Sequence, residues 1–78
     1  MGKKYENELA QALTEINDLK VAKDFLSNML TPNELEELVL RLQILKSLKA
    51  GIPQRKIAKD LNVSIGTVSR GSREVKYG

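Results

Sequence analysis

Residues 54–73 gather short, hydroxyl-bearing and cationic side chains at spacings that suit contact with a nucleic acid. Short side chains let the backbone of a helix approach the base edges of a major groove, and arginine binds phosphate or guanine there. These residue types predict DNA recognition by a helix that lies in the groove, helped by cations on the preceding helix. The candidate DNA-binding residues are Gln54, Arg55, Lys59, Ser64, Ile65, Gly66, Thr67, Ser69, Arg70 and Arg73.

Two short helices joined by a turn are needed to position these groups. Ile57, Ala58 and Leu61 place apolar groups on one face of a first helix, where the small Ala58 permits a close and steep crossing. Asn62 follows and tolerates the left-handed backbone that turns the chain. The spacing is that of a helix-turn-helix, and the alternative is an ordinary helical hairpin with a solvated basic face.

The second of these helices is expected to begin after Ser64, whose hydroxyl suits the N-cap position. Ile65 and Val68 fall three residues apart, so both are expected to pack back on the first helix. We expect this last helix to run from about Ile65 to Lys76.

The distribution of charge agrees with a DNA-binding role for the C-terminal part. Residues 1–50 carry seven Lys/Arg against eight Asp/Glu, a net charge of −1, whereas residues 51–78 carry six against two, a net charge of +4. The excess positive charge therefore coincides with the helix-turn-helix, as a polyanion-binding face requires. The alternative is that these cations only form a solvated surface.

Composition excludes several other classes of function. The 78 residues include no cysteine and no histidine, which rules out disulfides, thiol nucleophiles and an ordinary transition-metal site. The usual catalytic base is missing, and no spaced carboxylate pair suggests a pocket, so an enzyme is not expected. No apolar run approaches the roughly 18 to 20 residues of a membrane span, and the N-terminus lacks a signal-peptide core. We expect a cytoplasmic, nucleoid-associated protein.

Helical periodicity also covers the N-terminal half. Apolar residues at three- and four-residue steps predict an amphipathic helix from about Lys4 to Asp18 or beyond. The apolar pattern resumes at Val21, either within the same helix or after a break near Asn17 and Asp18. The fold class expected is all-α, with about five helices.

A strong helix start follows at Thr31-Pro32-Asn33-Glu34, with threonine as N-cap, proline at the first helical position and glutamate at the third. The helix is expected to reach Ala50 and to end at Gly51, a natural C-cap. Pro53 is expected in the first turn of the next helix.

The helix from Thr31 to Ala50 has more apolar surface than one core contact needs, because one leucine stripe is broadened by further aliphatic residues: Leu35, Leu38, Val39, Leu40, Leu42, Ile44, Leu45 and Leu48. A chain this small could hardly cover that surface, so we expect a homodimer. The alternative is a thoroughly buried central helix in a monomer. We expect one domain over 1–78, with a helical dimerisation core at 4–50 and a DNA-reading head at 53–77.

The run from Met29 to Ser72 resembles the tryptophan repressor (Trp repressor) family. The resemblance rests on MLTP at the start of the long helix, Arg41 within it, Gln54-Arg55 at the next helix, and Arg70-Gly71-Ser72 in the last. It covers about residues 26–76, and the closing segment 75–78 is also similar to a divergent branch of the superfamily. The resemblance implies an intertwined homodimer that binds double-stranded DNA at a palindromic operator, with L-tryptophan as corepressor.

The resemblance also implies a pocket for that amino acid. Arg41 and Arg70 match the two arginines that flank the indole ring, Arg70 also suits the ligand carboxylate, and Gly71 leaves room for the ring. Leu30 and Thr31 match positions of the partner subunit that close the pocket near the ligand amine. The implied ligand-binding set is Leu30, Thr31, Arg41, Leu45, Arg70, Gly71 and Glu74.

Some residues depart from the family pattern. Asn28 replaces a leucine, and Glu74 replaces a serine at the pocket edge, where its carboxylate would pair with an ammonium group, Arg70 or Lys76. Arg41 has an alternative role as an ion-pair partner of Glu37. Family members usually carry a further helix after the reading head, whereas five residues follow Arg73 here, so we expect a minimal dimer or cover from the first helix.

Two alternatives to a ligand-gated repressor therefore stay open. One is a constitutive DNA-binding or architectural protein that has lost the effector site. The other is a helical interaction module with no nucleic-acid role, against which the basic reading head argues.

Overall fold

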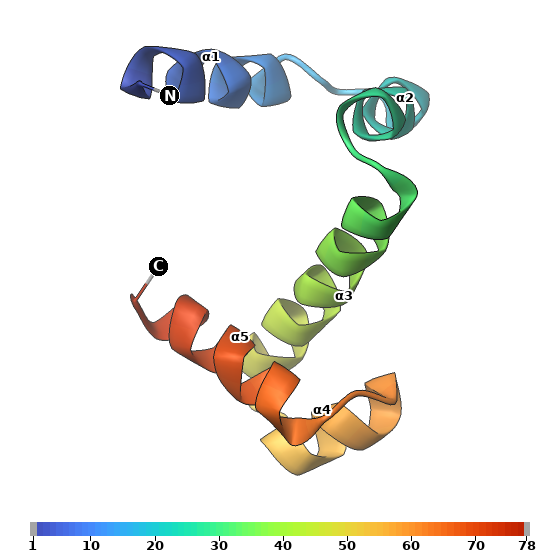
Figure 1. The fold of residues 1–78 in the computed structure, drawn as a ribbon, viewed down its shortest axis with the longest axis vertical. Helices are drawn as coiled ribbons and strands as arrows, with labels where there is room; N and C mark the ends of the chain where they lie inside the picture. Colours follow the sequence, from blue (N-terminus) through green and yellow to red (C-terminus); the bar gives the residue numbers. More distant parts are fainter. Residues whose placement is uncertain (1, 78) are drawn as a thin grey trace. The chain divides into compact units, whose positions relative to one another are not determined.

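The computed structural model describes the backbone of residues 2–77 and the side chains of residues 2–73. Its described residues form five α-helices and no strand, as predicted (Figure 1). They are α1 (Lys3–Thr14), α2 (Leu19–Met29), α3 (Pro32–Lys49), α4 (Gln54–Leu61) and α5 (Ile65–Tyr77). The chain divides into two compact units, residues 1–32 and residues 33–78, and each is described by itself.

The first unit consists of α1 and α2, joined by residues 15–18 and set at a wide angle to each other (Figure 1). The break near Asn17 and Asp18 is the correct one of the two alternatives, and α1 ends at Thr14 rather than at Asp18. Asp18 explains the restart, because its carboxylate Oδ2 accepts a hydrogen bond from the backbone N–H of Val21 at 3.1 Å. Aspartate in this position satisfies an otherwise unpaired amide at the start of α2.

The second unit begins within α3 and contains the helix-turn-helix. α3 begins at Pro32, as predicted, and its last turn closes at Gly51, which has a φ of +79°. The N–H groups of Gly51 and Ile52 donate to the carbonyls of Leu48 and Ser47 at 3.0 and 3.1 Å. This pairing satisfies carbonyl groups that the end of the helix leaves open, and glycine adopts the required backbone without strain.

The turn between α4 and α5 uses the same hydrogen-bond pattern with a different residue. Asn62 has a φ of 56° and a ψ of 48°, the left-handed conformation predicted for it. The N–H groups of Asn62 and Val63 donate to the carbonyls of Lys59 and Ala58 at 3.3 and 3.0 Å. Pro53 lies just before α4 rather than in its first turn, and its carbonyl accepts from the N–H of Ile57 at 3.1 Å.

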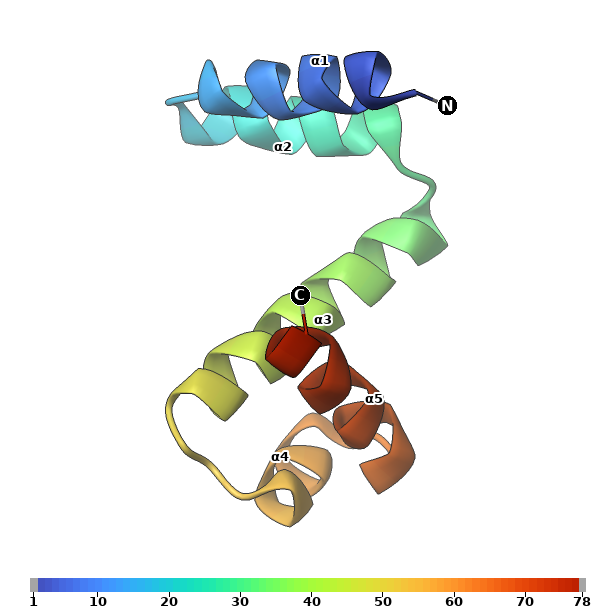
Figure 2. The ribbon, with the colours of Figure 1, turned by 90° about the vertical axis from the view of Figure 1, so that its left-hand side faces the viewer.

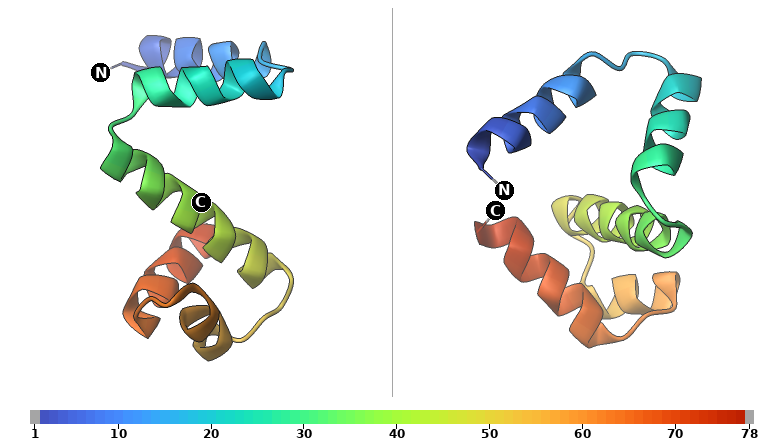
Figure 3. Two further views of the ribbon diagram at one scale, coloured as in Figure 1. Left: turned by 90° about the vertical axis from the view of Figure 1, so that its right-hand side faces the viewer. Right: turned by 45° about the horizontal axis from the view of Figure 1, so that its top comes forward.

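The core of the second unit lies where α3, α4 and α5 meet (Figure 2 and Figure 3). It consists of Ile44, Ile57, Ala58 and Val68, all buried. Half-buried apolar side chains pack around it from the helices and turns: Leu40, Leu48, Ile52, Leu61 and Val63. Ala58 therefore fills the predicted place between the two helices of the helix-turn-helix.

One core prediction is wrong. Ile65 was expected to pack back on α4 together with Val68, but its side chain is 50% exposed whereas that of Val68 is 0% exposed. Ile65 is the first residue of α5, where the helix has just left the turn and Val63 already covers the neighbouring core. Its apolar side chain is left on the surface.

Both units leave large apolar side chains exposed when the chain is taken alone. In α3 they include Leu38, Val39 and Leu42, the last at 53% exposure. In the first unit α1 and α2 bury no described side chain, and they expose Tyr5, Leu9, Leu13, Leu19, Val21 and Met29. No helix in the described part of the chain is long and apolar enough to cross a membrane. Apolar exposure on this scale is typical of a surface that another subunit covers.

We expect wild-type protein to sediment as a homodimer at low micromolar concentration. Leu42→Asp should unfold the chain rather than release a folded monomer, because folding and association are coupled in small dimers. Sedimentation velocity combined with circular dichroism measures both properties. Gln43→Asp, which adds the same charge at the next, exposed position of α3, should leave the dimer intact. A folded wild-type monomer would contradict the prediction.

Candidate DNA-reading head and ligand pocket

The start of α5 is held by a cap that the sequence predicted. The hydroxyl of Ser64 accepts a hydrogen bond from the backbone N–H of Thr67 at 3.1 Å. The hydroxyl groups of Ser64 and Thr67 also lie 2.9 Å apart and are hydrogen-bonded to each other. Each hydroxyl has one proton, so this pair leaves one O–H free to donate outward. The two side chains therefore order the helix start and still offer one donor beside it.

A second polar contact joins α4 to α5. The hydroxyl of Ser69 donates to the side-chain oxygen Oε1 of Gln54 at 2.8 Å in a partly buried position. This contact links the first residue of α4 to the middle of α5, and it occupies the carbonyl end of the glutamine amide. The amide nitrogen is left to donate elsewhere, which suits a phosphate oxygen.

The remaining candidate DNA-binding residues lie on the surface of the head. Arg55 and Lys59 are exposed on α4, and Arg70 and Arg73 are exposed on α5. Ile65 and Gly66 are exposed at the start of α5, where short or apolar groups allow close approach to base edges.

A third cation of α4, Lys56, already has an ion-pair partner on the same helix. Lys56 forms an exposed ion pair with Asp60, its Nζ lying 3.1 Å from Oδ2. Lys56 is therefore a less available phosphate ligand than Arg55 or Lys59, which have no such pair with the residues that the structure describes.

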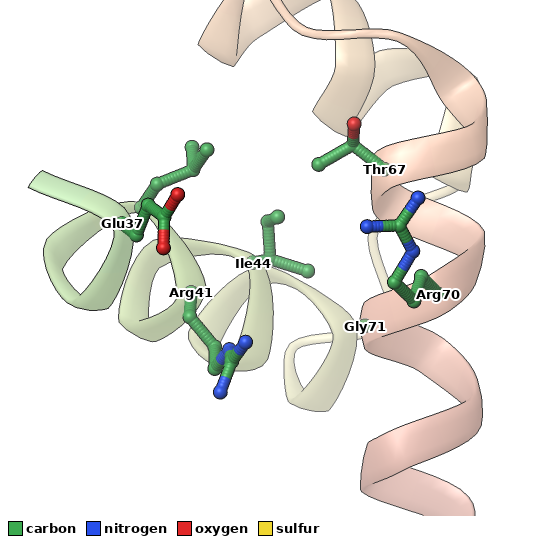
Figure 4. Close-up of a pocket in the computed structure, with 7 residues that line it drawn as sticks. Glu37, Arg41, Ile44, Thr67, Arg70 and Gly71 are labelled. Carbon is green, nitrogen blue, oxygen red and sulfur yellow. The ribbon is translucent and has the colours of Figure 1, made fainter. Parts of the chain in front are cut away.

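A cavity of about 300 Å³ opens between α3 and α5 beside this head. In Figure 4, α3 crosses α5, and the guanidinium of Arg70 points into the space between the two helices. The cavity has an apolar floor and a charged and hydroxyl-bearing rim, formed by Glu37, Leu40, Arg41, Ile44, Thr67, Arg70 and Gly71. Its volume is at the lower end of the range for small-molecule sites.

The structure brings together three residues of the implied ligand-binding set, namely Arg41, Arg70 and Gly71. Leu45 is half-buried on α3 but does not line the cavity. Leu30 and Thr31 belong to the first unit, whose position relative to the cavity is not described. The side chain of Glu74 lies outside the described residues.

Sequence reasoning missed four residues that line the cavity: Glu37, Leu40, Ile44 and, as a pocket residue, Thr67. Three of them share a face of α3 with Arg41, because positions 37, 40, 41 and 44 follow the helical steps i, i+3, i+4 and i+7. That spacing around Arg41 was the signal that would have found them.

Gly71 has a packing role that the sequence did not predict. A Cβ atom at this position would lie 2.8 Å from Cγ2 of Ile44, which is closer than van der Waals contact allows. The missing side chain therefore lets α5 approach the buried Ile44 of α3. Gly71 sets the crossing of the two helices that form the cavity, besides lining it.

Among the described residues, no group of three or more acidic side chains is placed to hold a metal ion. The described residues of the site offer exposed cations, hydroxyl groups and one small cavity.

Comparison with known proteins gives a consistent result. The sequence model of the family described as Trp repressor protein matches residues 5–78. A Trp operon repressor homolog of Haemophilus influenzae is 38% identical over 71 residues, which cover 90% of this chain and 70% of that protein. The Trp operon repressor homolog of Vibrio atlanticus is 36% identical over 81 residues, covering 97% and 83%. The homolog of Mannheimia succiniciproducens is 46% identical over 55 residues, covering 69% and 54%. No solved structure matches the chain.

The two glycines of α5 provide a matched test of the helix crossing. Gly71→Ala should lower the free energy of unfolding by about 1–3 kcal/mol, the usual cost of overpacking a core, because the added methyl group meets Ile44. Gly66→Ala should raise it by roughly 0.5–1 kcal/mol, because Ala favours the helix and its Cβ would meet only Ser64 Oγ at 3.7 Å. Urea unfolding of both variants measures the difference, and equal effects would contradict the role given to Gly71.

Proposed function

The chain belongs to the Trp repressor family, and on that premise we propose that it represses transcription by binding a palindromic operator as a homodimer, with L-tryptophan as corepressor. The family is one of DNA-binding transcription regulators, and the helix-turn-helix would supply the DNA-binding element. Residues 4–50 would build the dimer and residues 53–77 the reading head. A dimer would present two such heads to the two halves of an operator.

One observation carries this proposal furthest. Arg70 lines the cavity and also lies on the exposed surface of α5, among the candidate DNA-binding residues. A ligand in the cavity would therefore contact the same helix that enters the major groove. This placement would connect effector binding with operator binding through a single helix.

The cavity residues suit an aromatic amino acid. Guanidinium groups such as those of Arg41 and Arg70 stack on aromatic rings, and Arg70 also binds a carboxylate well. Leu40 and Ile44 offer apolar surface to the ring. Further contacts, proposed from the family, come from Leu30 and Thr31 of a partner subunit and from Leu45 and Glu74.

We propose that one set of residues in the reading head contacts DNA phosphates and another set contacts base edges. Gln54, Arg55 and Lys59 at the first helix, with Arg73 on the second, would contact the DNA backbone. The start of α5 would meet base edges, through Ser64, Ile65, Gly66, Thr67, Ser69 and Arg70. Phosphate contacts would supply affinity and base contacts would supply sequence preference.

Coupling between ligand and DNA needs only a modest energy. A ligand that raises operator affinity tenfold must bind the DNA-competent arrangement of the heads about 1.4 kcal/mol more favourably than the other arrangements. Arg70 can contribute directly, since its charge lies beside both the cavity and the DNA-facing surface.

A constitutive DNA-binding protein is the second candidate, and one observation favours it. The carboxylate of Glu37 lines the same cavity as the guanidinium of Arg70. A carboxylate of the protein at this cavity can offset the charge of Arg70 in place of a ligand carboxylate, which would lessen the need for a corepressor.

Cation replacement tests the phosphate contacts. Arg55→Ala or Lys59→Ala should weaken binding to all DNA sequences and reduce the slope of log affinity against log salt by about 1, because each side chain neutralises one phosphate. Lys56→Ala is the matched control, since Lys56 is paired with Asp60 and should change the slope less. Fluorescence anisotropy at several salt concentrations measures these slopes. Selection from random duplex DNA that enriches no half-site would contradict sequence-specific repression.

Operator binding with and without L-tryptophan tests the corepressor. Arg70→Ala should lose ligand affinity and DNA affinity together, because Arg70 is placed to serve both. Arg41→Ala should lose mainly the response to ligand, because Arg41 lines the cavity from α3 and is not part of the reading helix. Calorimetric titration of L-tryptophan gives the first quantity, and anisotropy with operator DNA gives the second. Wild-type operator affinity that saturating L-tryptophan leaves unchanged would support the constitutive candidate instead.

A further inference from the structure

The hydrogen bond between Ser69 and Gln54 lies at the edge of the core of the second unit. The two residues are 15 positions apart in the sequence, and their side chains meet at 2.8 Å in a partly buried position. Ser69 directly follows Val68, which is 0% exposed. Gln54 lies about one helical turn before Ile57, which is 1% exposed. The bond therefore joins two side chains whose helices the core already packs together.

This bond leaves the nitrogen end of the Gln54 amide free to donate. Oε1 accepts from Ser69, and the two N–H groups on Nε2 donate to no other group among the described residues. Arg55, the next residue, is exposed and cationic. Proteins use both glutamine amides and arginine to contact phosphate oxygens. A phosphate of the DNA backbone is therefore the acceptor that suits these N–H groups.

We propose that Ser69 is a positioning residue that acts on DNA through Gln54. Its hydroxyl holds Oε1 of the amide, so that Nε2 is directed at a phosphate oxygen. This inference rests on the proposed function, and among the residues grouped there with the base edges it gives Ser69 a role directed at phosphate.

The gain in affinity comes from ordering the glutamine before DNA arrives. A free glutamine side chain loses the freedom of several rotatable bonds when it is fixed in a contact. The bond to Ser69 removes part of that freedom in the unbound protein. The apolar contacts of Ile57, Ala58 and Val68 already hold α4 against α5, so the bond is not needed for that purpose.

Two properties separate this contact from the others proposed for the head. An amide is neutral and replaces no counterion by its own charge, so it adds affinity without increasing the dependence on salt. A phosphate contact also carries no sequence information, so its contribution is the same for every DNA sequence. Loss of Ser69 should show both properties.

DNA binding by a set of variants tests this role. Ser69→Ala removes the donor, Ser69→Thr keeps it, and Gln54→Ala removes the amide, alone and together with Ser69→Ala. The control is Ser47→Ala, at a half-buried serine of α3 outside the proposed DNA-binding residues. Fluorescence anisotropy at several salt concentrations uses two duplexes, one with the half-site enriched by selection and one of random sequence. Circular dichroism shows that each variant is folded.

The expected result is a uniform loss that depends on Gln54. Gln54→Ala should weaken binding to both duplexes about tenfold per head, the loss of one hydrogen bond to a charged group. Ser69→Ala should weaken both about threefold per head, because the amide is present but must be ordered on binding. It should cause no further loss when residue 54 is already alanine. Ser69→Thr should restore wild-type affinity, every salt slope should stay at its wild-type value, and Ser47→Ala should change nothing.

A measurement without DNA tests the same role if Ser69→Ala does not fold. Nitrogen-15 relaxation reports the motion of the Gln54 side-chain amide in free wild-type protein. An amide nearly as ordered as the backbone supports the inference, and a freely mobile amide would overturn it.

The outcomes also distinguish the inference from the function on which it rests. Unchanged affinity with Ser69→Ala, a changed preference between the duplexes, or losses that multiply in the double variant would overturn the role of Ser69 and leave operator binding standing. If selection enriches no half-site, sequence-specific repression fails while the losses on random DNA still test Ser69. Failure of wild-type protein to bind either duplex would overturn both proposals.

Discussion

The contact between Ile44 and Gly71 determines how the helices of the second unit are arranged. Ile44 is the buried side chain that α3 contributes to the core, where it packs with Ile57 and Val68, and it is 3% exposed. α5 comes this close to α3 because residue 71 has no side chain, and a Cβ atom there would lie 2.8 Å from Cγ2 of Ile44. Core packing leaves little freedom at such a contact, so the crossing of α3 and α5 is fixed by it. The cavity lies beside that crossing, and its shape depends on the same two residues.

Polar side chains fix the start of α5 and its position relative to α4. Ser64 caps α5, and Ser69 joins α5 to Gln54 on α4. These groups also belong to the proposed DNA-binding surface, so the bonds that order the helix-turn-helix also prearrange part of that surface. Ordering before binding reduces the entropy that association would otherwise cost.

Local chemistry made the helix ends predictable. Pro32, Gly51, Asn62 and Ser64 each act through their own backbone or side chain, so the sequence was sufficient to place them. The break before α2 was left open because the apolar pattern continues across it, and only the cap at Asp18 decides between the alternatives. The exposure of Ile65 was missed because its spacing from Val68 gives no information about how far α4 extends beside it.

The cavity was only partly predictable for a related reason. Arg41, Arg70 and Gly71 were found through the family resemblance, which does not report the residues particular to this chain. The lining by Glu37, Leu40 and Ile44 depends on which face of α3 meets α5, and that is a tertiary property. The helical spacing around Arg41 would have named these residues once the crossing was known.

Thr67 lines the cavity while its hydroxyl is bonded to Ser64 at the cap of α5. Under the proposed assignments, Thr67 and Arg70 each belong to both surfaces, whereas Glu37 on α3 belongs to the cavity alone. Evolution toward a new effector would therefore be constrained at the α5 wall, where any replacement also alters operator reading. Glu37 on the α3 wall carries no such constraint, and relatives that respond to different small molecules are expected to diverge first at position 37.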